Sequence, residues 1–118
     1  MAVQQVQKGA TANLSFSIRD SSRVLINADA MPTVTGIQLS GAATTTTGIT
    51  IVQQQDPTPA NITGRYYAKI ANTTTTGWTD LATGEIQLSA TIGGVTCTEE
   101  LKFIVRAATF YTPYIDVD

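Results

Sequence analysis

The stretch GEIQLSATIGGVTCTEELKFIVR, residues 84–106, carries the clearest structural signal in the chain. Its first half alternates apolar and polar residues up to Gly93-Gly94, a dipeptide that suits a tight hairpin turn because both positions tolerate positive φ. The returning half carries Val95 and Cys97, and alternation resumes after Glu99-Glu100, where we expect a bulge. The apolar face of this hairpin comprises Ile86, Leu88, Ala90, Ile92, Leu101, Phe103 and Val105. The stretch therefore predicts two long antiparallel strands, each half-buried.

Shorter segments on the N-terminal side repeat this period of two. They are NLSFSIRD (13–20), VLINA (24–28), TVTGIQLS (33–40), ITIVQQ (49–54) and GRYYAKIA (64–71), and we expect each to be a strand. Gly36 predicts a bulge within its strand, and GAATTTTG (41–48) reads as a loop. No window shows a sustained helical period. The pattern favours an all-β, antiparallel sandwich of about seven strands with Greek-key connections.

This register predicts which side chains form the core. The expected set is Leu14, Phe16, Ile18, Tyr66, Ile70, Ile86, Leu88, Ile92, Phe103 and Val105.

Length and composition limit the classes of protein. The chain has 118 residues, which predicts one domain, residues 1–106, followed by a C-terminal arm, residues 107–118. Only 14% of residues are charged, against roughly 25% in ordinary domains, so part of the surface is expected to face other protein. The seven basic residues are scattered and predict no nucleic-acid partner. No apolar run suits a membrane helix and no signal peptide is recognised, so we expect a protein that is made in the cytoplasm and kept soluble, without Sec export.

The residues that usually carry catalysis are scarce. Cys97 is the only cysteine and histidine is absent, so a thiol nucleophile would lack its usual base. Glu99 and Glu100 are adjacent, and neighbours in a strand point to opposite faces. We therefore predict no enzyme activity, no cofactor and no metal. The alternative is a calcium site formed by Asp116, Asp118 and a loop aspartate such as Asp80, although no loop has calcium-binding spacing.

Two aromatic residues allow more than one interpretation. Trp78 either closes one end of the core or stacks on a sugar ring, and the first role is the commoner for a lone tryptophan. Tyr67 falls on the outward face of its predicted strand, between Arg65 and Lys69. An exposed tyrosine beside cations is typical of an interface, but it is also found on ordinary surfaces.

The last twelve residues, AATFYTPYIDVD (107–118), follow the last predicted strand. Pro113 lacks a backbone N–H and disfavours a central strand, so we expect an extended arm. Its apolar residues need a surface on which to be buried. We predict an interaction segment formed by Phe110, Tyr111, Pro113, Tyr114 and Ile115 that lies on a neighbouring subunit. In the alternative, the arm folds back across its own sandwich.

The order of segments resembles an immunoglobulin-like module of tailed-bacteriophage virion proteins. The resemblance is carried by KGATANLSFSIRD (8–20), MPTVTG (31–36), TGRYYAKIA (63–71) with its G-x-Y-x-A-x-I pattern, and the long hairpin closing on F-x-V. The sequence departs from the pattern at Ser21-Ser22-Arg23, where a glycine turn is expected. The segment after Arg106 lies beyond the module.

This resemblance implies an immunoglobulin-like sandwich that serves as capsid decoration or cement protein, tail-tube or fibre appendage, or neck component. We expect a head decoration protein on the outer surface of the virion head. Its expected partners are the major capsid protein and sister subunits, with which it would form a homotrimer. The alternatives are a tail, fibre or neck appendage, and a carbohydrate-binding adhesion module that uses Trp78 and Tyr67.

Overall fold

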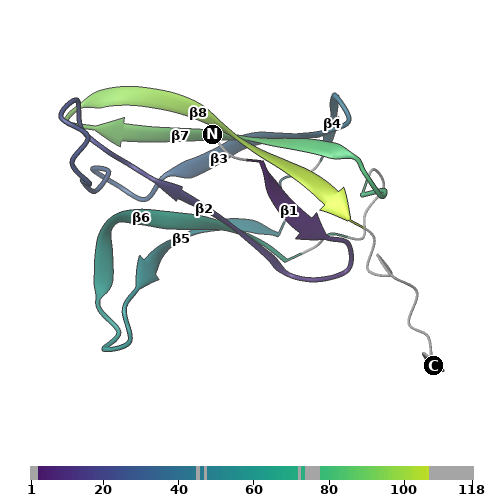
Figure 1. Cartoon of the computed structure of the whole chain (residues 1–118). Helices are drawn as coiled ribbons and strands as arrows, with labels where there is room; N and C mark the ends of the chain where they lie inside the picture. The colour runs from purple at the N-terminus through teal and green to yellow at the C-terminus, as the bar shows by residue number, and fades with distance from the viewer. Residues whose placement is uncertain (1–2, 45, 47, 72, 74–77, 107–118) are drawn as a thin grey trace.

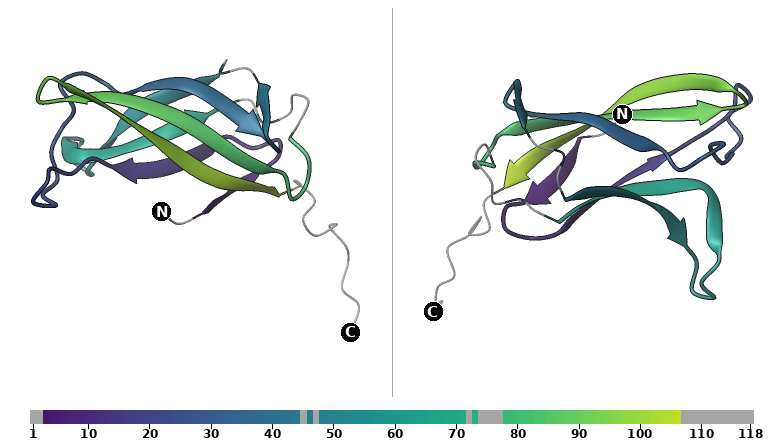
Figure 2. Two further views of the ribbon diagram at one scale, coloured as in Figure 1. Left: turned by 90° about the horizontal axis from the view of Figure 1, so that it is seen from above. Right: turned by 180° about the vertical axis from the view of Figure 1, so that it is seen from behind.

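The computed structural model describes residues 3–44, 46, 48–71, 73 and 78–106, and these residues form strands without any helix. The eight strands are β1 (Gln4–Gln7), β2 (Ala12–Ser17), β3 (Thr33–Leu39), β4 (Ala42–Thr44), β5 (Ile49–Gln55), β6 (Asn61–Ile70), β7 (Thr83–Ile92) and β8 (Val95–Arg106). One sheet has the order β1-β8-β7-β3-β4 and the other β2-β6-β5. The two sheets face each other as layers (Figure 1), and the view from behind shows the same arrangement (Figure 2, right). The prediction of an all-β fold is confirmed.

The hairpin that dominated the sequence pattern forms as predicted. Strands β7 and β8 pair antiparallel from Thr83↔Ile104 to Ile92↔Val95. The turn between them uses positive φ at Gly93 (58°) and Gly94 (80°). The expected irregularity at Gly36 is also present, as a shift in the pairing of β3 with β7.

Three local predictions need correction, and one strand was missed. The segment 24–28 is not a strand and makes only the isolated bridge Arg19↔Leu25. No bulge interrupts β8 at Glu99-Glu100, because its pairing with β7 is continuous. The predicted loop 41–48 begins with strand β4, and β1 was not predicted at all. Since β1 pairs with β8 in parallel, the architecture is mostly rather than wholly antiparallel.

The reason segment 24–28 leaves the sheet is local hydrogen bonding. The Asp20 carboxylate accepts from the backbone N–H of Ser22 (2.8 Å) and of Val24 (3.0 Å), which closes a tight turn. Asp and Asn side chains compete with sheet ladders in this way. The following residues then cross between the two sheets instead of extending one.

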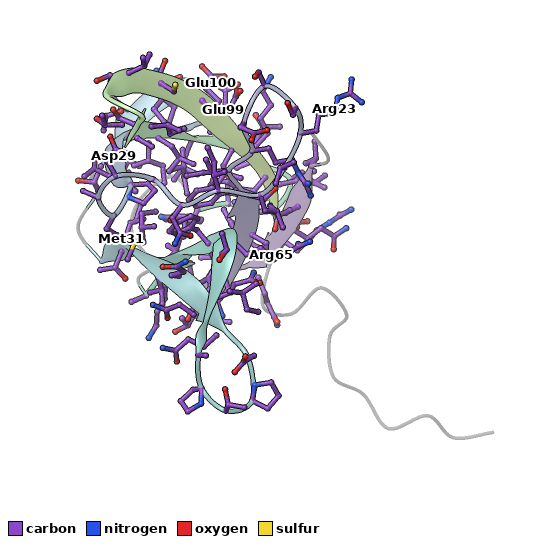
Figure 3. All side chains as sticks on the ribbon, turned by 90° about the vertical axis from the view of Figure 1, so that its left-hand side faces the viewer. Arg23, Asp29, Met31, Arg65, Glu99 and Glu100 are labelled. Carbon is purple, nitrogen blue, oxygen red and sulfur yellow. The ribbon has the colours of Figure 1, made fainter. Side chains whose placement is uncertain are left out.

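The crossing segment, residues 18–32, ties the two sheets together at the β7–β8 hairpin end. Asn27 Oδ1 accepts from the backbone N–H of Gly64 in β6 (2.8 Å). The Asp29 carboxylate accepts from the backbone N–H of Gly93 (3.0 Å) and Gly94 (2.9 Å) at the hairpin turn. Figure 3 looks onto this end of the molecule, with Asp29 and Met31 on one side and Arg65 on the lower sheet.

The β5–β6 turn is held by Asp56. Its carboxylate accepts hydrogen bonds from the hydroxyl of Thr58 and from the backbone N–H groups of Ala60 and Thr58. These donors lower the pKa of Asp56, in that order of effect, because they stabilise the charged form. The hairpin tip bends away from the other sheet (Figures 1 and 2).

The core lies between the sheets and includes most of the predicted set. Of those ten side chains, Leu14, Ile18, Tyr66, Ile70, Ile86, Leu88, Phe103 and Val105 are buried. Phe16 and Ile92 are only half-buried, because both lie toward the end where the sheets separate. The sandwich closes at its other end, where Trp78 is 2% exposed and stacks on Phe103 with ring centroids 5.5 Å apart. Trp78 therefore has the core role predicted for it.

Candidate functional surfaces

Tyr67 lies on the outer face of the three-stranded sheet, as its period predicted. It is half-buried in β6, opposite Ser15 of β2 and Val52 of β5. Arg65 and Lys69 flank it on the same face, and both are exposed. Strands β2, β5 and β6 contain no aspartate or glutamate, so this face has positive charge without a carboxylate within its own strands.

A shallow hollow of about 420 Å³ adjoins Tyr67. Its lining consists of Asn13, Ser15, Val52, Gln53, Gln54, Gln55 and Tyr67. Gln54 reaches across β6 and its Nε2 donates to the Ser15 hydroxyl at 3.4 Å. The amide and hydroxyl side chains of Asn, Gln and Ser neither gain nor lose a proton near neutral pH. The hollow can therefore offer hydrogen bonds and one aromatic ring to a partner, and Tyr67, with its weakly acidic phenol, is the only titratable side chain among the described residues of its lining.

The predicted C-terminal interaction residues cannot be placed beside Tyr67. Phe110, Tyr111, Pro113, Tyr114 and Ile115 lie outside the described residues, as do Asp116 and Asp118. The predicted arm, residues 107–118, and its two alternative positions therefore remain predictions.

The acidic pair is divided between two faces, as its adjacency predicted. Glu100 stands opposite Gln87 and Glu99 opposite Leu88 in the β7–β8 pairing, so their side chains leave opposite sides of the strand. Cys97 is exposed in the same strand. Among the described residues, no three histidine, cysteine or acidic side chains group closely enough to hold a metal ion.

We expect that excess EDTA leaves the melting temperature of the purified protein unchanged, because the described residues form no metal cluster. The measurement is thermal unfolding followed by circular dichroism, with and without the chelator. A parallel sample with added Ca²⁺ serves as the control for a site involving Asp80. A clear fall in the melting temperature with EDTA, or a rise with Ca²⁺, would contradict the prediction.

One further surface was missed by the sequence analysis: an open groove at the β7–β8 hairpin end. Its volume is about 260 Å³ and its lining is largely apolar, comprising Phe16, Ser17, Ile18, Arg19, Pro32, Leu88, Ala90, Ile92, Cys97, Thr98 and Glu99. It lies where β2 ends at Ser17, while β7 and β8 continue to their turn at Gly93-Gly94. The β7–β8 hairpin therefore extends past the end of β2. The sequence shows that Val95 and Cys97 lie on the same face of their strand. It does not show whether another element covers that face.

No family model matches the chain, and a search of curated proteins found no match either. Among the described residues, no helix is both long and apolar enough to span a membrane.

Proposed function

We propose that this protein is a structural component of a tailed-bacteriophage virion, and specifically a head decoration protein that binds the outer surface of the capsid. Its partners in this role are the major capsid protein and sister subunits, arranged as a homotrimer. The protein is made in the host cytoplasm and ends up on the outside of the head. It has no catalytic task.

The observation that carries this proposal is the strand order. In immunoglobulin domains, one sheet contains strands B, E and D, and the other contains C, F and G with C′ added in the variable type. The orders β2-β6-β5 and β4-β3-β7-β8 correspond to B-E-D and C′-C-F-G, and β1 lies beside the last strand. This correspondence supports an immunoglobulin-like identity. It agrees with the resemblance of segments 8–20, 31–36, 63–71 and 84–106 to phage virion modules.

The surface supports a binding role better than a catalytic one. The positive face around Tyr67 and the apolar groove at the hairpin end are two separate areas that could contact protein. Interfaces are enriched in tyrosine and arginine, which the first area provides. In the proposed homotrimer, one of these areas would contact the shell and the other the sister subunits.

The adhesion alternative is less well supported. Sugar binding by stacking needs exposed aromatic rings, and Trp78 is buried against Phe103. Among the described residues, Tyr67 and Phe16 are the only aromatic side chains that are more than slightly exposed, and they lie on different sides of the sheet. A tail, fibre or neck appendage would use the same fold and remains the closest alternative.

The test is to locate the protein on virions of the phage that encodes it. Gold-labelled antibodies raised against the purified chain are expected to mark the head in negative-stain images. Virions from a phage with the gene deleted provide the control and should lose the label and show weaker resistance of the head to heat. Label confined to the tail or neck would assign the alternative role, and absence of label from intact virions would overturn a virion function.

A further inference from the structure

At the groove near the β7–β8 hairpin end, the inner face of one sheet is not covered by the other sheet. In β8 the side chains of Val95, Cys97 and Glu99 fall on the same side as the core residues Leu101, Phe103 and Val105, because strands alternate with a period of two. The core residues are buried, whereas Val95 is 63% exposed. An inward-facing strip is therefore open to solvent where the other sheet ends.

The backbone of β8 is open along the same stretch. Strand β1 pairs with β8 only from Gln4↔Phe103 to Gln7↔Arg106. Residues 95–102 pair with β7 on one side, and no described strand pairs with them on the other. A strand edge of this kind is a template for another strand, whose backbone adds the missing hydrogen bonds while its side chains enter neighbouring pockets.

The size of the groove suits side chains rather than a separate small molecule. Pockets for drug-sized ligands usually measure about 300–1,000 Å³. The groove is smaller, about 260 Å³, and is lined mainly by Phe16, Ile18, Leu88, Ala90 and Ile92. The polar residues of its lining are Ser17, Arg19, Thr98 and Glu99. Such a site can take one or two large apolar side chains from an extended chain.

A suitable extended segment exists in the sequence. Residues 107–118 contain Phe110, Tyr111, Tyr114 and Ile115, and Pro113 disfavours their use in a central strand. The described structure ends with β8 at Arg106, at the end of the sandwich opposite the groove (Figure 1).

Geometry places the part of the chain's own groove at Cys97 beyond the reach of the first two rings of this segment. Cys97 is nine residues from Arg106 in the same strand and lies about 30 Å from it at roughly 3.3 Å per residue. Fully extended, the Cα atoms of Phe110 and Tyr111 can lie at most about 14 and 18 Å from Arg106, and the length of an aromatic side chain does not make up the difference. A neighbouring molecule has no such limit.

We propose that the groove receives residues 107–118 of a second copy of this chain. An aromatic side chain, Phe110 or Tyr111, occupies the apolar groove, and the backbone of the segment lies along residues 95–102 of β8. This inference rests on the proposed role of the C-terminal segment in contacts between copies. The contact is head-to-tail, and such contacts close into a ring when the rotation between subunits allows it. A ring of three would give the expected homotrimer.

The test uses Cys97, which lies in the groove and is the only cysteine in the chain. Tyr111→Cys protein labelled with ¹⁵N is mixed with unlabelled Tyr111→Cys protein, oxidised mildly and digested with trypsin. The expected product is a disulfide joining tryptic peptide 70–102 of one isotope to peptide 107–118 of the other. Absence of this product, or linked peptides that always carry the same isotope, would overturn the proposal. The Cys97→Ser, Tyr111→Cys double variant is the control and cannot form the link.

A second measurement does not depend on an added cysteine. Ala90 lines the groove, whereas its neighbour Ser89 lies on the outer face of β7, and both are half-buried. Ala90→Arg is expected to weaken self-association at least about tenfold by light scattering, equivalent to about 1.4 kcal/mol. Ser89→Arg should leave it unchanged. Circular dichroism confirms that both variants fold, and equal association of the two would refute the groove as the acceptor.

These outcomes separate the inference from the proposed function. Both measurements use purified protein and do not involve a capsid. If the protein self-associates but the Cys97 link does not form, the groove does not bind residues 107–118 of a second copy. A homotrimer on the head would still be possible in that case. Conversely, antibody label on the tail would change the proposed role without affecting the cross-link.

Discussion

Phe103→Ala is expected to lower the free energy of unfolding by about 3–5 kcal/mol, the usual range for removing a phenylalanine from a core. Phe103 is 1% exposed, stacks on Trp78 and covers Gly84 of the neighbouring strand. A Cβ at Gly84 would lie 2.0 Å from the Phe103 ring, so the ring occupies the space that a side chain would otherwise take. Removing it leaves a cavity beneath Trp78. Urea denaturation followed by tryptophan fluorescence measures the loss.

The matched control is Phe16→Ala. Phe16 also has an aromatic neighbour, Tyr66, with ring centroids 5.6 Å apart, but it is only half-buried at the open end. Its removal should therefore cost clearly less than that of Phe103. Equal losses at both sites would mean that the end near Phe16 is closed in solution, and a near-neutral Phe103→Ala would refute the register of β8.

Gly64→Ala is expected to cost about 2–5 kcal/mol. Gly64 has a φ of +72°, a conformation that costs an L-residue about 1–2 kcal/mol. In addition, a Cβ there would lie 2.9 Å from the backbone O of Ile18 and from the backbone N and O of Ile26. These atoms belong to the crossing segment and cannot move without breaking its hydrogen bonds, so overpacking adds about 1–3 kcal/mol.

Gly41→Ala separates the two causes. Gly41 has a similar φ of +82°, but no atom lies within 4 Å of the position its Cβ would take. It should therefore show only the cost of positive φ, about 1–2 kcal/mol. Urea denaturation of both variants gives the comparison. If Gly41→Ala and Gly64→Ala lose the same stability, the close approach of the crossing segment to β6 contributes nothing.

The sequence predicted correctly those features of the fold that depend on a single strand or turn. The faces of β2, β6, β7 and β8, the turn at Gly93-Gly94 and the irregularity at Gly36 all follow from alternation and from glycine's backbone freedom. Trp78 in the core and Tyr67 on the outside were also predicted correctly. Apart from Trp78, which was assigned to the core because that is the commoner role of a lone tryptophan, these features depend on neighbours along the chain, whose spacing is visible in the sequence.

The errors arose where local turns or contacts with distant parts of the chain override the alternation pattern. VLINA has the composition of a strand, but Asp20 turns the chain and Asn27 and Asp29 bind β6 and the β7–β8 turn instead. QQVQ has little apolar character, yet it becomes β1 because Val6, 1% exposed, packs into the core beside β8. Strand-like composition is thus neither sufficient nor necessary when tertiary hydrogen bonds and a single buried side chain decide pairing.

The sequence by itself determined an all-β chain, the inward faces of its longest strands and the scarcity of catalytic groups, because these depend on residue type and on a period of two. Only the tertiary structure decided that two sheets of unequal length meet, that β1 covers just part of β8, and that Ala90, Ile92 and Cys97 line an open groove. Whether an apolar face of a strand is exposed depends on which element packs against it. That element comes from elsewhere in the chain, so it is known only from the complete fold.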